Sequence, residues 1–415
     1  MRHAMLAVLL VVPSLLLAAP QDAVLHAGGI PPPDFRLEQA AGAEEIAIPF
    51  QSVNHHLLLP VMVNGAGPFQ IILDTGMPME DLILYDSERV KDLNLAYLDA
   101  QMKVAGAGGD GKGMSARIAQ GVALGIGELK ILDERATVLS TPPGFAGYHD
   151  GVIGAALFRH FVVSIDNDRR VVTLRRPETF RPPEGARLVP LTIEQNRVYV
   201  DATVRVESGE AVPVSLVVDL GASHAVSLNL SKEGRLRVPG RVIATGIGRG
   251  VSGEILGRVG RIRAFEIGGW TLGEVVATFP DKEYQSPHGV DSRDGNLGNG
   301  ALSRFNVTID YAGRRMFLEP ARSFSEPFEW DMSGFQAESA ADGAVRVSRV
   351  LPGSPAAQAD IQEGDRVVKI GGKEVTETTF FRLRERLKKD GETVVVELQR
   401  DDKPKTVSLK LRRLI

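Results

Sequence analysis

Two short stretches decide the fold: FQIILDTG from Phe69 to Gly76 and VSLVVDLG from Val214 to Gly221. In each stretch, apolar residues typical of a buried strand lead directly into an aspartate, and a glycine two positions later permits a tight turn. The two aspartates, Asp74 and Asp219, lie 145 positions apart. A turn directly after a buried strand brings each carboxylate to the surface of its own lobe.

The chain repeats other blocks at nearly the same offset. FVVSIDNDRRVVTL (Phe161–Leu174) reappears as FNVTIDYAGRRMFL (Phe305–Leu318), 144 positions later. Upstream, Gly151-Val152-Ile153-Gly154 corresponds to Gly295-Asn296-Leu297-Gly298 at the same offset. Three matched blocks in one order predict a duplicated domain of about 140 residues. Short apolar runs bounded by Gly, Pro, Asn or Asp predict that each copy is rich in β-strands.

Composition limits the remaining classes of protein. A chain of 415 residues with 43% apolar and 24% charged residues is typical of a globular protein of two to three domains. The net charge of −4 provides no global basic field, so no nucleic-acid partner is expected. The absence of cysteine excludes disulfides, thiol catalysis and cysteine-ligated zinc.

The N-terminus has the pattern of an export signal. Arg2 precedes an apolar run from Ala4 to Ala19, which is short for a membrane span and ends in small residues. We expect residues 1–19 to be a signal peptide, residues 20–41 to be a flexible lead-in, and the mature protein to be periplasmic or extracellular with no integral span. An uncleaved membrane anchor is the alternative.

The paired aspartates are the candidate for chemistry. Equivalent loops of a duplicated fold can meet across a pseudo-twofold axis, and two carboxylates a few Å apart then hold one proton between them. The charged member can take a proton from water while the neutral member donates to a carbonyl oxygen, which is general acid–base hydrolysis. The alternative role for each aspartate is a turn cap that bonds its own backbone.

Asp74-Thr75-Gly76, the later Asp150-Gly151-Val152-Ile153-Gly154 and the duplication together resemble the retropepsin-like and pepsin-like aspartyl proteases, in particular bacterial exported members with a PDZ domain. The resemblance covers residues 45–320. It implies that Asp74 and Asp219 form the catalytic dyad and that polypeptides are the substrates. It also implies supporting and flap residues: Thr75, Gly76 and Gly221 in the dyad loops, Gly154 and Gly298 behind them, and Gly108, Gly109, Gly246 and Gly248 in glycine-rich flap hairpins.

Two positions depart from the family pattern. The family has Thr or Ser after each catalytic Asp, and its hydroxyl bonds to the opposite lobe; Thr75 fits this pattern, but Leu220 has no hydroxyl. Met77 stands where Ser or Ala is usual. One lost hydrogen bond weakens positioning by about 1 kcal/mol. The alternative function is therefore a catalytically impaired, protease-like scaffold that binds envelope peptides or proteins.

The C-terminal region resembles a PDZ domain over residues 328–415, with PGSPA at Pro352–Ala356 followed by Gly364-Asp365 and a late helix. Such domains bind a peptide C-terminus as an added strand. The resemblance implies protein C-termini as partners and six peptide-binding residues: Met332, Ser333, Gly334 and Phe335 in the carboxylate-binding loop, and Thr378 and Thr379 at the start of the helix.

The predicted fold class is therefore mainly β. Two tandem retropepsin-like β-barrel lobes, residues 42–180 and 181–320, form a pepsin-like bilobal unit, and an α+β PDZ domain follows. No cofactor and no metal are expected. The glycines at 106–111 formally match a dinucleotide-binding pattern but lack a following helix, and the histidines have no metal-ligand spacing.

Overall fold

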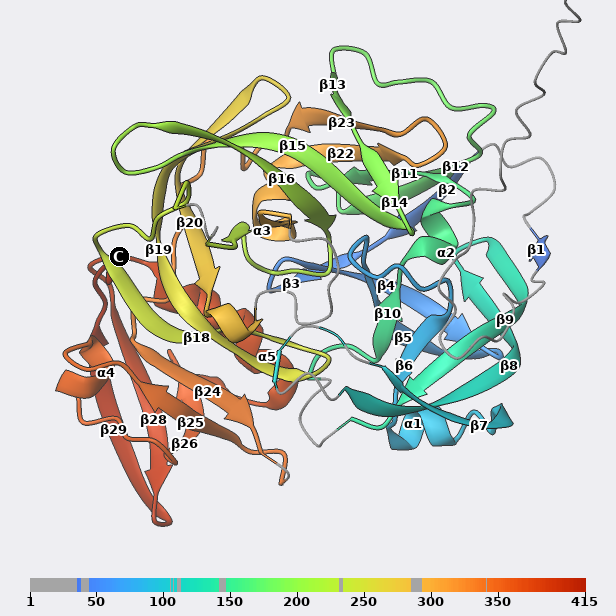
Figure 1. The fold of residues 1–415 in the computed structure, drawn as a ribbon. Helices are drawn as coiled ribbons and strands as arrows, with labels where there is room; N and C mark the ends of the chain where they lie inside the picture. Colours follow the sequence, from blue (N-terminus) through green and yellow to red (C-terminus); the bar gives the residue numbers. More distant parts are fainter. Residues whose placement is uncertain are drawn as a thin grey trace, which may run out of the picture.

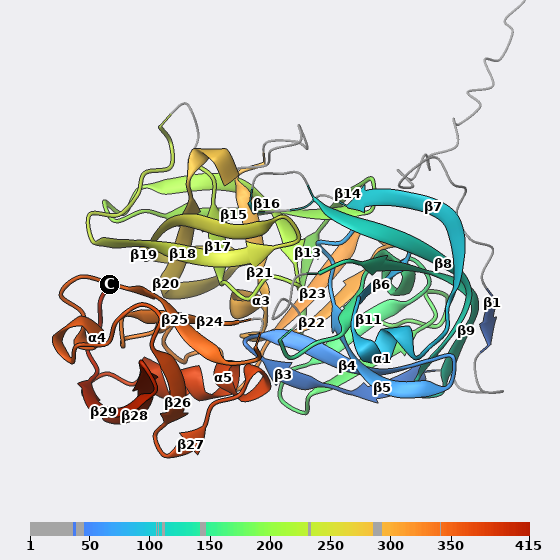
Figure 2. The same ribbon diagram turned by 90° about the horizontal axis from the view of Figure 1, so that it is seen from below.

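The computed structural model describes residues 36–38, 45–104, 106, 108–109, 113–141, 147–230, 234–284, 293–340 and 342–415. The described chain is mainly β, with two barrel-like lobes that share one sheet and a smaller C-terminal domain packed against both (Figures 1 and 2). The expected signal peptide lies outside the described residues. No helix within the described ranges is long and apolar enough to cross a membrane.

The first lobe is a nine-stranded sheet in the order β1-β9-β6-β10-β5-β4-β8-β7, with β3 paired to β4. Residues 36–38, inside the expected lead-in, pair as β1 with β9, because the outer edge of that strand offers backbone groups for pairing. The elements are β1 (Arg36–Glu38), β3 (Gln51–Val53), β4 (His56–Val63), β5 (Ala66–Leu73), β6 (Leu82–Tyr85), α1 (Glu88–Lys91), β7 (Ala96–Val104), β8 (Met114–Ile126), β9 (Leu129–Leu139), β10 (Gly151–Ile153) and α2 (Ala155–Phe158).

The second lobe repeats this arrangement in an eight-stranded sheet, β14-β15-β16-β21-β17-β20-β19-β18. In both lobes a short strand inserts beside the strand that carries the aspartate, so the copies match in topology as well as in sequence. The elements are β14 (Thr192–Glu194), β15 (Arg197–Arg205), β16 (Ala211–Asp219), β17 (Val226–Leu228), β18 (Val242–Gly250), β19 (Gly253–Ile267), β20 (Trp270–Pro280), η2 (Lys282–Tyr284), β21 (Gly295–Gly298) and α3 (Asn299–Leu302).

A six-stranded sheet joins the lobes, in the order β13-β23-β22-β11-β12-β2. Its central pair is antiparallel, with Ser164 opposite Thr308 and the Thr308 hydroxyl 2.9 Å from the Ser164 hydroxyl. These two residues are 144 positions apart, so the pseudo-twofold axis of the repeat passes between them. The strands are β2 (Glu45–Pro49), β11 (Val162–Asp166), β12 (Val171–Arg175), β13 (Arg187–Pro190), β22 (Phe305–Asp310) and β23 (Arg315–Pro320).

The C-terminal domain has its own sheet, β24-β25-β26-β28-β29, and its own apolar core around Phe335, Phe380 and Leu387. The two lobes instead share one continuous core that runs through the joining sheet. The C-terminal elements are β24 (Phe335–Ser339), β25 (Val345–Val350), α4 (Pro355–Gln358), β26 (Arg366–Ile370), β27 (Lys373–Glu374), α5 (Glu377–Leu383), η3 (Arg384–Lys388), β28 (Thr393–Arg400) and β29 (Lys403–Lys410).

Candidate active site

Asp74 is held by the strand that inserts beside it. β10 pairs in parallel with β5 and antiparallel with β6, and the Asp74 amide donates to the Ile153 carbonyl over 2.9 Å. In the second lobe, β21 pairs in parallel with β16, so Asp219 lies beside Gly298. Gly154 and Gly298 therefore both lie directly behind the aspartate loops, where the resemblance places them.

The structure brings the two aspartates together across the pseudo-twofold axis. Their side chains share a hydrogen bond. A Cβ at Gly221 would lie 2.3 Å from the Cγ of Asp74, and one at Gly76 would lie 2.7 Å from the Cγ of Asp219. Each loop glycine thus faces the carboxyl group of the opposite lobe, and only a residue without a side chain fits there.

The two carboxyl groups differ in their electrostatic environment. Burial raises the pKa of Asp74. The Gly76 and Gly221 amides, which donate to its Oδ1 over 2.6 and 3.2 Å, oppose this rise because they stabilise the ionised form. Burial raises the pKa of Asp219 well above its usual range, and the neighbouring negative charge of Asp74 raises it further. Two backbone amides donate to one oxygen of Asp74 and favour its ionised form, so we assign the shared proton to Asp219.

Thr75 ties the floor of the site together. Its buried hydroxyl donates to the Val218 carbonyl over 2.7 Å and accepts from the Leu220 amide over 3.1 Å. This is the contact with the opposite lobe that the resemblance implies. Leu220 is fully buried and provides no reciprocal hydroxyl, so one side chain serves both backbone groups of the second lobe.

Asn296 is a site residue that no sequence motif indicated. Its Nδ2 donates to Oδ2 of Asp219 over 2.8 Å. The corresponding residue of the first lobe is Val152, which packs against apolar side chains. The sequence signal for this role is a polar residue, Asn296, at a repeat position where the first lobe has the apolar Val152. Asn296 gives Asp219 a side-chain hydrogen-bond donor that has no counterpart at Val152.

A cavity of about 1310 Å³ surrounds the dyad, and both of its walls mix apolar and polar side chains. On the side of the first lobe the lining residues include Met77, Ile83 and Val152 as well as Asn54, His55 and His149. On the side of the second lobe they include Val217, Ile247 and Val276 as well as Arg197, Asn229 and Arg293. A space of this size accommodates several residues of an extended polypeptide.

The glycine-rich segments of the two lobes meet each other over the cavity. The Gly109 amide donates to the Glu254 carbonyl over 2.9 Å, and the Gly106 amide donates to the Ser252 hydroxyl over 3.1 Å. A Cβ at Gly108 or Gly109 would lie within 2.0 Å of the backbone of the β18–β19 turn. Gly246 and Gly248 lie in β18 and line the cavity.

The proposed carboxylate-binding loop of the C-terminal domain is buried. Two of its backbone amides have partners within the chain, since Met332 donates to the Leu387 carbonyl and Ser333 donates to Oδ1 of Asp331 over 2.9 Å. The Phe335 amide donates to the Ser333 hydroxyl over 3.4 Å. Gly334 has a φ of +80° and lies against Ser354, which explains the glycine at this position.

Thr378 and Thr379 lie at the N-terminus of α5. The Thr379 hydroxyl accepts from the Thr376 amide and closes the helix cap, so it serves the helix itself. The residues of this helix that line the cavity are Phe380, Phe381 and, at its C-terminal end, Arg384.

Comparisons with known proteins agree with this architecture. Residues 202–301 match the family model described as aspartyl protease, and residues 333–411 match the PDZ domain model. The chain therefore contains an aspartyl protease domain and a C-terminal PDZ domain, which confirms the resemblance to these two families, while bacterial origin and export stay predictions. The mainly β fold class is confirmed as well.

Individual relatives match only parts of the chain. "Putative serine protease HhoB" of Synechocystis sp. is 34% identical over 70 residues, which is 17% of each chain. "PDZ domain-containing protein 8" of Mus musculus is 43% identical over 58 residues, 14% of this chain and 5% of that protein. The crystal structure of the aspartic proteinase from Irpex lacteus aligns with 68% of this chain and 99% of its own, with 14% identity and a TM-score of 0.46.

Proposed function

We propose that this protein is an aspartic endopeptidase that cleaves extended polypeptides. Ionised Asp74 takes a proton from a water molecule held between the carboxyl groups, while protonated Asp219 donates to the oxygen of the scissile carbonyl. The tetrahedral intermediate then collapses as Asp74 passes its proton to the leaving amine and Asp219 regains a proton from a hydroxyl of the intermediate, which restores both carboxyl groups. No covalent bond to the protein forms, and no cofactor or metal is needed.

One observation carries this proposal: the side chains of Asp74 and Asp219 hydrogen bond to each other at the floor of a large cavity. A pair of turn caps would instead bond only to their own loops. The unequal environments supply one acid and one base, as this chemistry requires. The aspartyl protease match over residues 202–301 supports the same function.

The test is hydrolysis of a mixed peptide library by the purified full chain from acidic to neutral pH. We expect Asp74→Asn and Asp219→Asn each to remove detectable cleavage while both proteins remain folded. Asp201→Asn is the matched control, because Asp201 is an exposed residue of β15 in the same lobe as Asp219. Equal cleavage by wild type and both dyad variants would refute the proposal.

A scaffold that binds peptides without cutting them is the second candidate. The observation that favours it is Leu220, which leaves the cross-lobe contact to Thr75 alone. Peptide binding without turnover at any pH would support the scaffold, and turnover gained by Leu220→Thr would show that the missing hydroxyl is the cause.

We also propose that the protein works in an exported compartment and that its PDZ domain binds protein C-termini. Export rests on Arg2 and the apolar run from Ala4 to Ala19. N-terminal sequencing of the protein from an extracytoplasmic fraction tests it, with a new N-terminus after Ala19 expected and an intact Met1 contradicting it.

A further inference from the structure

The PDZ domain contributes a wall to the cavity that holds the dyad. Gln336, Ala337 and Glu338 of β24 and Phe381 of α5 line the same cavity as Asp74 and Asp219. Figure 2 shows β24 and α5 beside β3 of the first lobe, with the second lobe on their other side. The groove in which PDZ domains bind peptides, between this strand and this helix, is therefore continuous with the candidate active site.

Contacts with both lobes hold the PDZ domain in this position. In the second lobe, Nε2 of Gln336 donates to the Gly246 carbonyl over 2.6 Å, and Arg249 pairs with Glu338 over 2.5 Å. In the first lobe, Phe381 packs against Tyr148 with ring centroids 4.7 Å apart. The groove thus keeps one orientation relative to the dyad.

β24 offers a template for an added strand. It is the terminal strand of its sheet, and within the described residues its outer edge has no strand partner. Side chains of β24 contact β18 directly through Gln336 and Glu338, and residues of both strands line the cavity. A polypeptide that adds to this edge enters the cavity in an extended conformation.

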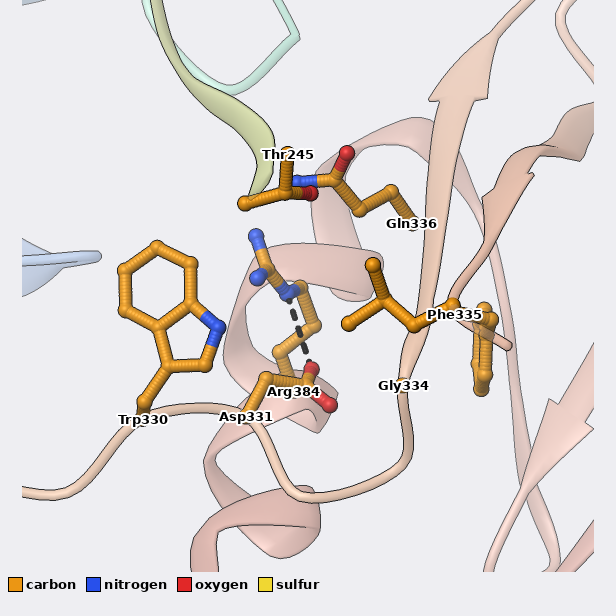
Figure 3. Close-up of a pocket in the computed structure, with 8 residues that line it drawn as sticks. Thr245, Trp330, Asp331, Gly334, Phe335, Gln336 and Arg384 are labelled. Carbon is orange, nitrogen blue, oxygen red and sulfur yellow. Dashed lines mark hydrogen bonds and ion pairs between the residues drawn. The ribbon is translucent and has the colours of Figure 1, made fainter. Parts of the chain in front are cut away.

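Arg384 places a positive charge near the start of β24, where an added strand would end. Its Nε lies 3.4 Å from Oδ2 of Asp331, and the terminal guanidinium nitrogens point away from the helix toward Thr245, beside Trp330 (Figure 3). These residues surround a small pocket of about 10 Å³, which holds one water-sized group such as a carboxylate oxygen. The guanidinium provides paired donors suited to a carboxylate.

We infer that one polypeptide occupies both sites: its terminal carboxylate binds at Arg384, its last residues pair with β24, and the preceding residues reach the dyad. The inference rests on the proposed peptidase function. An extended chain rises about 3.3 Å per residue, so a fixed anchor and a fixed dyad define a fixed number of residues. The substrate class is polypeptides with a free C-terminus, cut at a set distance from that end.

The test uses peptides of one sequence, as the free acid, as the C-terminal amide, and with two residues added at the C-terminus. We expect amidation to lower kcat/KM about 10-fold or more, from the loss of a charge-assisted contact. We expect the added residues to move the cleavage site two positions toward the C-terminus, as mapped by mass spectrometry. Unchanged sites and equal rates for acid and amide would overturn the inference.

Variants of the anchor sharpen the result. Arg384→Gln should abolish the difference between acid and amide, and Arg384→Lys, which keeps the charge, should restore part of it. Arg386→Ala is the matched control, because Arg386 bonds the Gly371 carbonyl and is not among the cavity-lining residues. Discrimination that persists in Arg384→Gln would overturn the assignment of the anchor.

Failure of the peptidase function can be separated from failure of this inference. The experiment uses the Asp74→Asn variant and a free-acid peptide with two photoreactive groups. The group near the C-terminus should crosslink to the PDZ domain, and the group further upstream should crosslink to the lobes. Crosslinks to both parts would support shared occupancy even if no peptide were cleaved by the wild type. Crosslinks confined to one part would overturn it.

Discussion

Replacing Thr75 with valine tests whether a single hydroxyl couples the two lobes. The hydroxyl bonds the Val218 carbonyl and the Leu220 amide, and the side chain is fully buried. Valine has nearly the same shape, so the substitution removes the hydrogen bonds with little change of packing. Both backbone groups of the second lobe would lose a partner away from water.

Leaving a buried polar group unpaired costs about 1–3 kcal/mol, so the two groups together predict a loss of about 2–6 kcal/mol. For lobes of this size, each kcal/mol lowers Tm by about 2–4 °C, which predicts a fall of roughly 4–24 °C. The loops that carry Asp74 and Asp219 would also lose their mutual alignment. We therefore expect kcat to fall more than KM changes.

Thermal unfolding followed by circular dichroism and peptide hydrolysis provide the two measurements. Thr75→Ser keeps the hydroxyl and is the control; it should lose less than half of the stability that valine loses. A Thr75→Val protein with the Tm and kcat of the wild type would refute the reasoning, because the structure assigns this hydroxyl to both backbone contacts.

Further predictions concern space and charge. Gly221→Ala places a Cβ within van der Waals overlap of Asp74, so peptide hydrolysis should fall about 100-fold or more, and an active variant would contradict the geometry. Activity should follow a bell-shaped curve against pH, rising as Asp74 ionises and falling as Asp219 loses its proton. Because the pKa of Asp219 is raised on folding, its protonated form stabilises the fold at low pH, and this stability declines as pH rises. The Asp219→Asn variant should therefore show a smaller decline in Tm with rising pH. Burial raises the pKa of Glu134 from 4.5 to about 8, so the free energy of unfolding should fall by roughly 5 kcal/mol between pH 4.5 and pH 8. Urea unfolding of Glu134→Gln should show a weaker dependence of stability on pH. For Asp219 and for Glu134, a variant with the same pH dependence of stability as the wild type would contradict the pKa assigned to that residue.

The duplication and the position of the aspartates could be predicted from the sequence because both leave local signals. The offset of 144 residues anticipates the axis between Ser164 and Thr308, since equivalent strands of a twofold repeat pair with each other. The family expectation and the mainly β class followed from the same blocks. An apolar run before Asp and Gly is a strong local determinant of a strand and a turn.

Other features depend on contacts between distant segments. Asn296 bonds Asp219 because β21 inserts beside β16, and no local pattern reports that pairing. The position of the PDZ groove beside the cavity depends on contacts between segments far apart in the sequence. Gln336 bonds Gly246 of the second lobe, and Arg384 bonds Asp331 in the loop before β24. Thr379 illustrates the converse, because a residue expected to contact peptide is used by the helix cap.

The six-stranded sheet between the lobes also determines which parts of the molecule can move. Each lobe contributes three strands, and the central β11–β22 pair lies at the pseudo-twofold axis, so backbone hydrogen bonds of one continuous sheet connect the two lobes. A protein nicked in the connection between β12 and β13 should still migrate as one particle under native conditions. Separation of the lobes would require the β11–β22 hydrogen bonds to break, so the pairing of these central strands opposes it.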